Sequence, residues 1–95
     1  MRYRITYRIE LYDGRQQHPA VYPYRTESAE TEKQARAIAA RMLGHRSLRG
    51  ASSWGRYKDG GRVFQFGPRT EESEYDYAAI VERKVAVLRV PDGFD

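Results

Sequence analysis

The N-terminal segment from Tyr3 to Tyr12 alternates between apolar and polar residues. Because successive side chains of a strand point to opposite faces of a sheet, this alternation predicts a half-buried strand, and its isoleucine and tyrosine content favours the same structure. One face of the predicted strand carries Tyr3, Ile5, Tyr7, Ile9 and Leu11, and the other carries Arg2, Arg4, Thr6, Arg8, Glu10 and Tyr12.

A second strand is predicted at residues 18–26, after the turn signal formed by Asp13 and Gly14. Its valine and tyrosines favour a strand, but Pro19 and Pro23 interrupt it. Because proline cannot donate a hydrogen bond to a β-ladder, we expect this strand at a sheet edge or in an irregular conformation.

Residues 31–44 show the spacing of an amphipathic helix. Thr31 and Gln34 form a capping-box pattern at its start, and Gly44 is placed to end it in a left-handed conformation. The small residues of the apolar stripe indicate a helix lying close on a sheet. The stripe consists of Ala35, Ile38, Ala39 and Met42 with Leu43 beside it, and the basic residues Lys33, Arg36 and Arg41 line the opposite side.

The segment WGRYKDGGRVFQF, residues 54–66, predicts a hairpin whose turn lies in KDGG. A two-residue turn pairs odd positions with even ones. It places Tyr57, Phe64 and Phe66 in the core, on the same face as Arg62, and leaves Trp54, Arg56 and Lys58 on the other side. A three-residue turn with a bulge instead gathers Trp54, Phe64 and Phe66 with the basic residues on one face, as a stacking platform. We favour the two-residue turn, because so small a protein needs its large aromatic side chains buried.

The C-terminal segment is predicted as strand over residues 85–90, whereas residues 73–84 fit either a strand or a second helix. These elements together predict one small α+β domain spanning residues 1–95. It consists of an antiparallel sheet of about four strands with the helix at 31–44 packed on it.

Charge is distributed unevenly along the chain. Residues 1–69 hold 14 Lys and Arg against 6 Asp and Glu, a net charge of +8, and residues 70–95 hold 3 against 7, a net charge of −4. Of the 17 basic residues 14 are arginine, whose planar fork suits phosphate, although the base composition of a genome also enriches arginine. The excess of positive charge favours a polyanionic partner.

Catalytic, metal and membrane signatures are absent from the sequence. The chain has no cysteine, and its two histidines, His18 and His45, are far apart, so we expect no metal site and no cofactor. Ser52, Ser53 and His45 lack an acidic partner, and we expect no enzymatic activity. With neither a signal peptide nor a membrane-spanning segment, we expect a cytoplasmic protein that does not bind membranes.

The order of strand, turn, strand and helix, with a Thr-x-x-x-Ala helix start from Thr31 to Ala35, is similar to that of the arm-type DNA-binding domains of tyrosine recombinases. The similarity covers less than half of the chain and rests on a common helix start. The prolines of the second strand and the segment after residue 50 do not match that family, so we assign none.

The function that we expect is a non-enzymatic module that binds nucleic acid, DNA or RNA, through contacts to its backbone. The alternative is an adaptor or inhibitor that docks on an acidic protein surface, and an exposed sheet edge also allows a homodimer. The residues expected to bind the partner are Trp54, Arg56, Lys58, Arg62, Arg46, Arg49, Arg2, Arg4 and Arg8.

Overall fold

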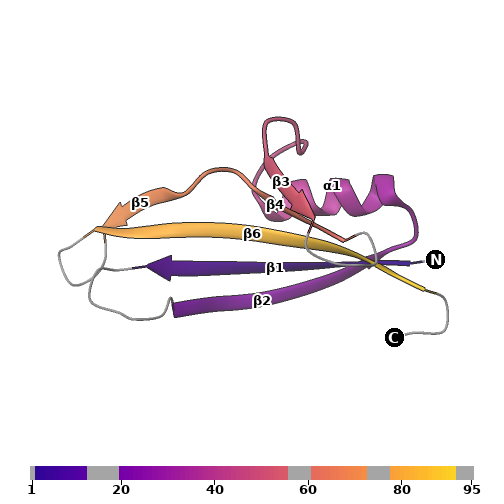
Figure 1. Cartoon of the computed structure of the whole chain (residues 1–95), viewed down its shortest axis with the longest axis horizontal. Helices are drawn as coiled ribbons and strands as arrows, with labels where there is room; N and C mark the ends of the chain where they lie inside the picture. The colour runs from indigo at the N-terminus through magenta and orange to yellow at the C-terminus, as the bar shows by residue number, and fades with distance from the viewer. Residues whose placement is uncertain (1, 13–19, 56–60, 73–77, 92–95) are drawn as a thin grey trace.

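The computed structural model describes residues 2–12, 20–55, 61–72 and 78–91. They form one antiparallel sheet with a single helix packed near one end of it (Figure 1). The elements are β1 (Arg2–Tyr12), β2 (Ala20–Ala29), α1 (Glu32–Met42), β3 (Ser52–Gly55), β4 (Arg62–Gln65), β5 (Arg69–Glu72) and β6 (Ala78–Val90). The predicted α+β class is therefore confirmed, with six strands in place of about four.

Strands β1 and β6 form the long centre of the sheet, paired from Arg2 opposite Val90 to Tyr12 opposite Ile80. The strand order is β2-β1-β6-β4-β3, and β5 also pairs with β6. Strands β4 and β5 follow one another along the same edge of β6, separated by residues 66–68. The expected count was too low because the chain pairs again after Gly67 and Pro68, in a segment for which no strand was predicted.

The structure resolves the ambiguity of the C-terminal segment in favour of a strand. Residues 78–84 belong to β6 and are continuous with the predicted strand at 85–90, while 73–77 lie outside the described residues. The second strand stands at a sheet edge, as its prolines predict. Its pairing with β1 shifts register where Pro23 interrupts it, between the pairs Tyr7–Arg25 and Ile9–Tyr22.

Helix α1 begins and ends at the predicted signals. The Thr31 side chain accepts a hydrogen bond from the Gln34 backbone N–H at 3.1 Å, and the Gln34 side chain in turn accepts one from the Glu30 N–H at 3.2 Å. Gly44 follows the C-terminal cap with a φ of 80°, a left-handed conformation that costs glycine little. These contacts satisfy backbone groups that helix termini leave unpaired.

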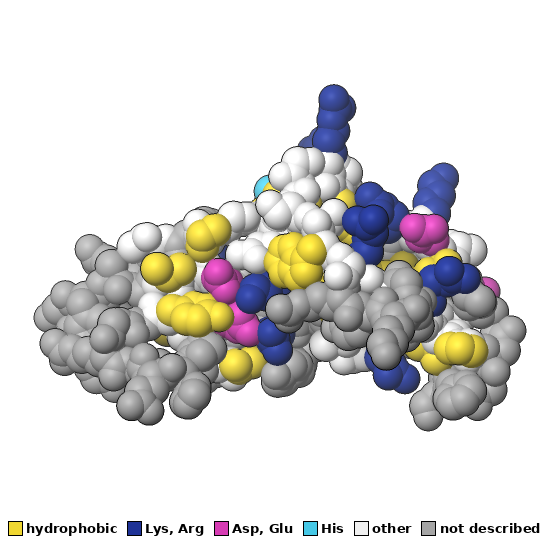
Figure 2. All heavy atoms as spheres, in the orientation of Figure 1, with side chains coloured by type: hydrophobic (Ala, Val, Ile, Leu, Met, Phe, Trp, Pro, Cys, Tyr) yellow, Lys and Arg dark blue, Asp and Glu magenta, His cyan; other side chains and the backbone are white. Residues whose placement is uncertain are grey.

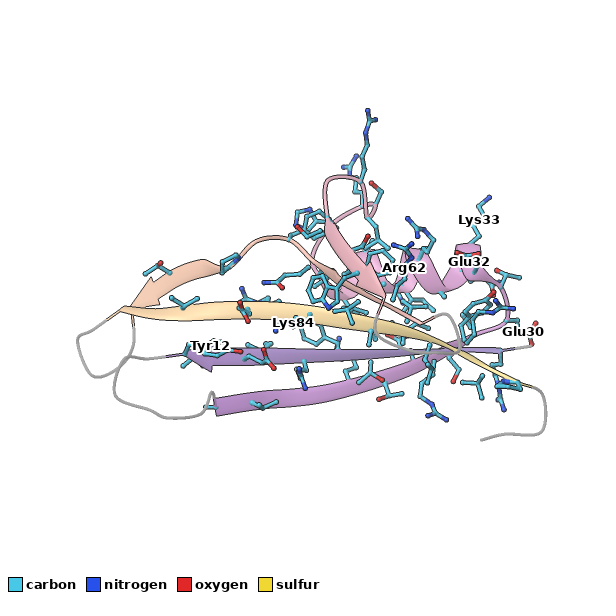
Figure 3. All side chains as sticks on the ribbon, in the orientation of Figure 1. Tyr12, Glu30, Glu32, Lys33, Arg62 and Lys84 are labelled. Atoms are coloured by element: carbon cyan, nitrogen blue, oxygen red, sulfur yellow. The ribbon has the colours of Figure 1, made fainter. Side chains whose placement is uncertain are left out.

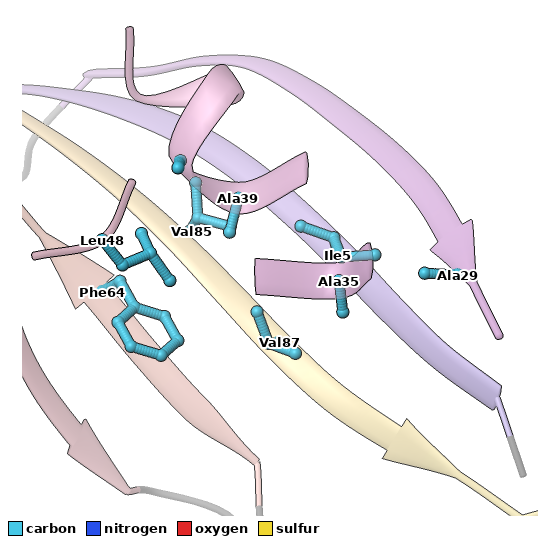
Figure 4. Packing of buried hydrophobic residues seen from close by; sticks show 9 residues of the cluster. Ile5, Ala29, Ala35, Ala39, Leu48, Phe64, Val85 and Val87 are labelled. Carbon is cyan, nitrogen blue, oxygen red and sulfur yellow. The ribbon is translucent and has the colours of Figure 1, made fainter. Parts of the chain in front are cut away.

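The core lies between α1 and the middle strands of the sheet (Figure 4). Ala35 and Ala39 on the helix, Ile5 on β1 and Val85 on β6 are fully buried. Because the helix presents alanines, its backbone lies close to the sheet, as the narrow apolar stripe predicts. Leu48, in the loop after the helix, extends this core to Phe64 on β4.

The pairing of β3 with β4 decides between the two predicted face assignments of the hairpin. Trp54 lies opposite Val63 and Gly55 opposite Arg62, so odd positions pair with even ones. This confirms the face assignment of the favoured register: Phe64 is 4% exposed in the core, and Trp54 is on the other side of the sheet. The residues of the turn itself, 56–60, lie outside the described part of the chain.

Candidate functional site

The register of the sheet separates the predicted binding residues onto two faces. Directly paired residues share a face. Arg62 pairs with the core residue Val87 and therefore stands on the face that carries the helix. Trp54 stands on the opposite face, as do the three arginines of the first strand: Arg2, Arg4 and Arg8.

The remaining predicted residues are in or next to loops. Arg46 and Arg49 are exposed in the loop between α1 and β3, and Figure 1 shows this loop on the side of the sheet where the helix lies. Arg56 and Lys58 lie outside the described residues. The nine predicted residues therefore do not form one continuous surface in the described structure, and the helix face and its opposite face must be considered separately.

A groove of about 300 Å³ opens on the helix face. Three arginines from three different elements line it: Arg36 from α1, Arg62 from β4 and Arg89 from β6. We call it the arginine groove, and its other lining residues are Tyr3, Glu32, Phe64 and Val87. Figure 3 shows Arg62 beside the N-terminal half of the helix, where Glu32 also lies.

Packing holds two of these arginines in place. The Arg36 guanidinium lies 5.2 Å from the centroid of the Phe64 ring, a cation–π contact that attracts the cation to the face of the ring. Arg62 Nη1 donates a hydrogen bond to Ser53 Oγ at 3.2 Å. Within the described part of the chain, neither side chain forms an ion pair with a carboxylate. Both side chains are exposed at the surface, where an anion can reach them.

Glu32 is the single acidic residue among the groove's lining residues. It stands in the first turn of α1, where a carboxylate is stabilised by the positive end of the helix dipole. Three arginines and one glutamate leave the groove with a net positive charge.

The opposite face carries a network of paired charges instead. Glu10, 5% exposed, lies 2.7 Å from both Arg8 and Lys84, and Lys84 lies 3.1 Å from Glu82. The Tyr12 hydroxyl donates to Glu10 at 3.0 Å. Figure 2 shows acidic and basic side chains next to one another over the middle of the sheet. Arg8, one of the predicted binding residues, is thus already paired with a carboxylate.

This network sets the protonation of its members. Burial raises the pKa of the Glu10 carboxyl, but hydrogen bonds from Lys84 and Tyr12 and the charges of Lys84 and Arg8 outweigh burial, so that its pKa lies below the ordinary value. Burial lowers the pKa of Lys84, yet Glu10 and Glu82 outweigh it and hold that pKa above the ordinary value. Both groups are therefore charged at neutral pH.

Arg36 and Arg89 were not among the residues predicted to bind a partner. The sequence places Arg36 on the side of the helix away from its apolar stripe, which is typical of a solvated position. Arg89 shares the helix face because it has the same parity as Val85 and Val87 along β6. The alternation of the buried valines, extended by one step along β6, places Arg89 on the helix face.

No family model, curated protein or solved structure matches the chain. Among the described residues, no group of three or more histidines, cysteines or carboxylates is arranged to hold a metal ion. The one helix in this part of the chain is neither long nor apolar enough to cross a membrane.

Proposed function

We propose that the protein is a non-enzymatic module that binds nucleic acid through the arginine groove, mainly by contacts to the phosphate backbone. One observation carries this proposal: Arg36, Arg62 and Arg89, from three separate elements, line one groove. Because the sheet and the helix fix their positions relative to one another, an anion that binds there orders few additional groups.

The chemistry of the lining residues supports a phosphate ligand. A guanidinium offers several N–H donors in one plane and binds phosphate oxygens through two parallel hydrogen bonds. Tyr3, half-buried in the same groove, adds an aromatic ring against which an unpaired base can stack.

A titration of labelled DNA and RNA, single-stranded and double-stranded, at several salt concentrations tests the proposal. We expect an affinity that falls linearly with salt concentration on logarithmic axes, because phosphate contacts release counterions. Absence of binding at tens of micromolar protein near about 50 mM salt, where nonspecific binders normally register, contradicts the proposal.

A matched pair of double variants assigns the binding to the groove. Arg36→Gln with Arg62→Gln removes two positive charges from the helix face, and Arg2→Gln with Arg4→Gln removes two from the opposite face. We expect the first pair to weaken binding at least tenfold and the second to have a much smaller effect. Equal losses from the two pairs indicate attraction to net charge alone and contradict a specific groove.

A second candidate function is docking on a protein partner, through the face opposite the helix. Val21 and Ile80 are large hydrophobic residues that remain 38% and 49% exposed. The pairs Glu10–Val21 and Tyr12–Ile80 place them on the face that carries the Glu10 network. Exposed apolar side chains beside charges are typical of protein interfaces.

Recovery of one stoichiometric protein partner, lost on Ile80→Asp, supports this candidate. Sedimentation of the isolated protein as a dimer instead indicates self-association.

A further inference from the structure

A second hollow, of about 450 Å³, lies at the other end of helix α1. His45, Phe66 and Arg83 supply its aromatic and basic side chains, and Leu43 and Val81 supply apolar ones. We call it the His45 pocket; Gly44 and Gly67 complete its lining. It shares no residue with the arginine groove.

The aromatic side chains of the His45 pocket form a stack. The ring centroids of His45 and Phe66 are 3.6 Å apart, and their planes differ by 12°. Phe66 is half-buried against the core and covers one side of the imidazole, while His45 itself is exposed. The other side of the imidazole is therefore open to a further planar group, and a nucleobase is such a group.

The two hollows lie on the same face of the protein and are lined by similar kinds of side chain. Each pairs aromatic rings with an arginine of β6, Arg83 in the His45 pocket and Arg89 in the arginine groove. These arginines are six positions apart and have the same parity, so they share the helix face and stand roughly 20 Å apart along the strand. Arg46 and Arg49 follow His45 in the loop between α1 and β3.

We infer that the His45 pocket and the arginine groove are two subsites for one single strand of nucleic acid. This inference rests on the proposed function and narrows the ligand to an unpaired strand. Stacking on His45 requires an exposed base face, which a duplex does not offer along its length. A separation of roughly 20 Å suits a strand of several nucleotides, within the roughly 4–16 nucleotides that small single-strand-binding domains cover.

Competition binding with a mixed-sequence strand of about 12 nucleotides, inside that range, tests the inference. The proteins are the wild type, His45→Ala and His45→Phe, with the thermal midpoint of each measured as a check of folding. We expect His45→Ala to weaken binding at least about fivefold, the lower end of what one stacked base contributes. His45→Phe keeps a planar ring and is expected to retain wild-type affinity within about twofold, which a purely electrostatic role of His45 does not predict.

The same strand annealed to its complement completes the test. Weaker binding of the duplex than of the single strand at equal salt supports the inference. Equal binding of the two forms, or a His45→Ala affinity within about twofold of the wild type, overturns it while leaving the arginine groove as the binding site. Failure of every nucleic acid to bind overturns the proposed function itself, so the two failures are distinguishable.

Discussion

Lys84 Nζ lies 2.7 Å from Glu10 Oε2, joining two residues that are 74 positions apart in the chain. They stand on the neighbouring strands β6 and β1, in diagonal positions. Directly across the strands the charges are alike: Arg8 faces Lys84, and Glu10 faces Glu82. Each carboxylate nevertheless has a cation beside it, along the strand or on the diagonal. These attractions offset the repulsion between the like charges that face each other.

Replacing Glu10 with glutamine is expected to lower the free energy of unfolding by about 1–3 kcal/mol. The change leaves Arg8 and Lys84 opposite each other without the carboxylate that lies 2.7 Å from both. Denaturation by urea, followed by circular dichroism, measures the loss. The control is Glu27→Gln, whose partner Arg41 is 3.5 Å away and largely exposed. We expect it to change the stability by less than about 1 kcal/mol, and equal losses from the two variants contradict the assignment.

The stability difference between the wild type and Glu10→Gln is expected to depend on pH. Because the folded-state pKa of Glu10 is lowered, its contribution is present above the ordinary carboxyl pKa of about 4.3 and is lost as the pH falls through the folded-state value. Thermal midpoints of both proteins between about pH 7 and pH 3 should therefore converge at the acid end. A difference that stays constant over this range contradicts the role of the charge.

Thr31→Ala is expected to lower the free energy of unfolding by about 1 kcal/mol. The side chain accepts the hydrogen bond from the Gln34 N–H, and alanine leaves that donor without its cap. Ser28→Ala, at an exposed position of β2, is the control, with an expected change below about 0.5 kcal/mol. Chemical denaturation of both variants checks the prediction, which is wrong if Thr31→Ala is as stable as the control.

Arg36→Gln with Arg62→Gln is expected to change the salt dependence of nucleic-acid binding as well as the affinity. Each phosphate contact contributes about 0.9 to the slope of log K against log salt for duplex DNA and about 0.7 for single strands. Loss of two contacts should thus reduce the slope by about 1.4–1.8. An unchanged slope with a reduced affinity indicates that these arginines contact bases or shape the groove instead of neutralising phosphates.

Trp54→Ala separates the two faces of the sheet. Trp54 is half-buried opposite Val63, so its loss should cost about 1–2 kcal/mol of stability. A ligand held in the arginine groove lies on the other face, and we expect its affinity to change by less than about twofold. A twofold change in affinity corresponds to about 0.4 kcal/mol, which is less than the binding free energy that one stacked base contributes. A larger loss shows that the bound strand also reaches the face of Trp54, as the aromatic and basic pattern of the hairpin predicts.

Local patterns in the sequence predict the elements of the fold well. The alternation from Tyr3 to Tyr12 identifies β1 and its core face, and the cap at Thr31 and the glycine at 44 identify the bounds of α1 to within two residues. Pro23 places β2 at an edge. These features depend on neighbours in the chain, which is why the sequence alone contains them.

The composition of the candidate site depends on contacts between distant segments. Arg36, Arg62 and Arg89 meet because β4 pairs with β6 beneath the helix, and no local pattern specifies that pairing. Glu10, which the sequence assigns to the polar face of the first strand, is also buried. Its burial depends on the contact with Lys84 of β6, and the pattern of the first strand alone does not predict that contact.

On the edge of β6 away from β1, residues 66–68 separate two short partner strands. β4 pairs with positions 84–87, next to the core under the helix, and β5 pairs with positions 78–81, at the far end. Gly67, with a φ of 39°, breaks the ladder between them. Opening of β5 therefore need not disturb β4. The parts of β6 that pair with β5 and with β4 are expected to exchange their amide hydrogens with solvent at different rates, faster where β5 is the partner.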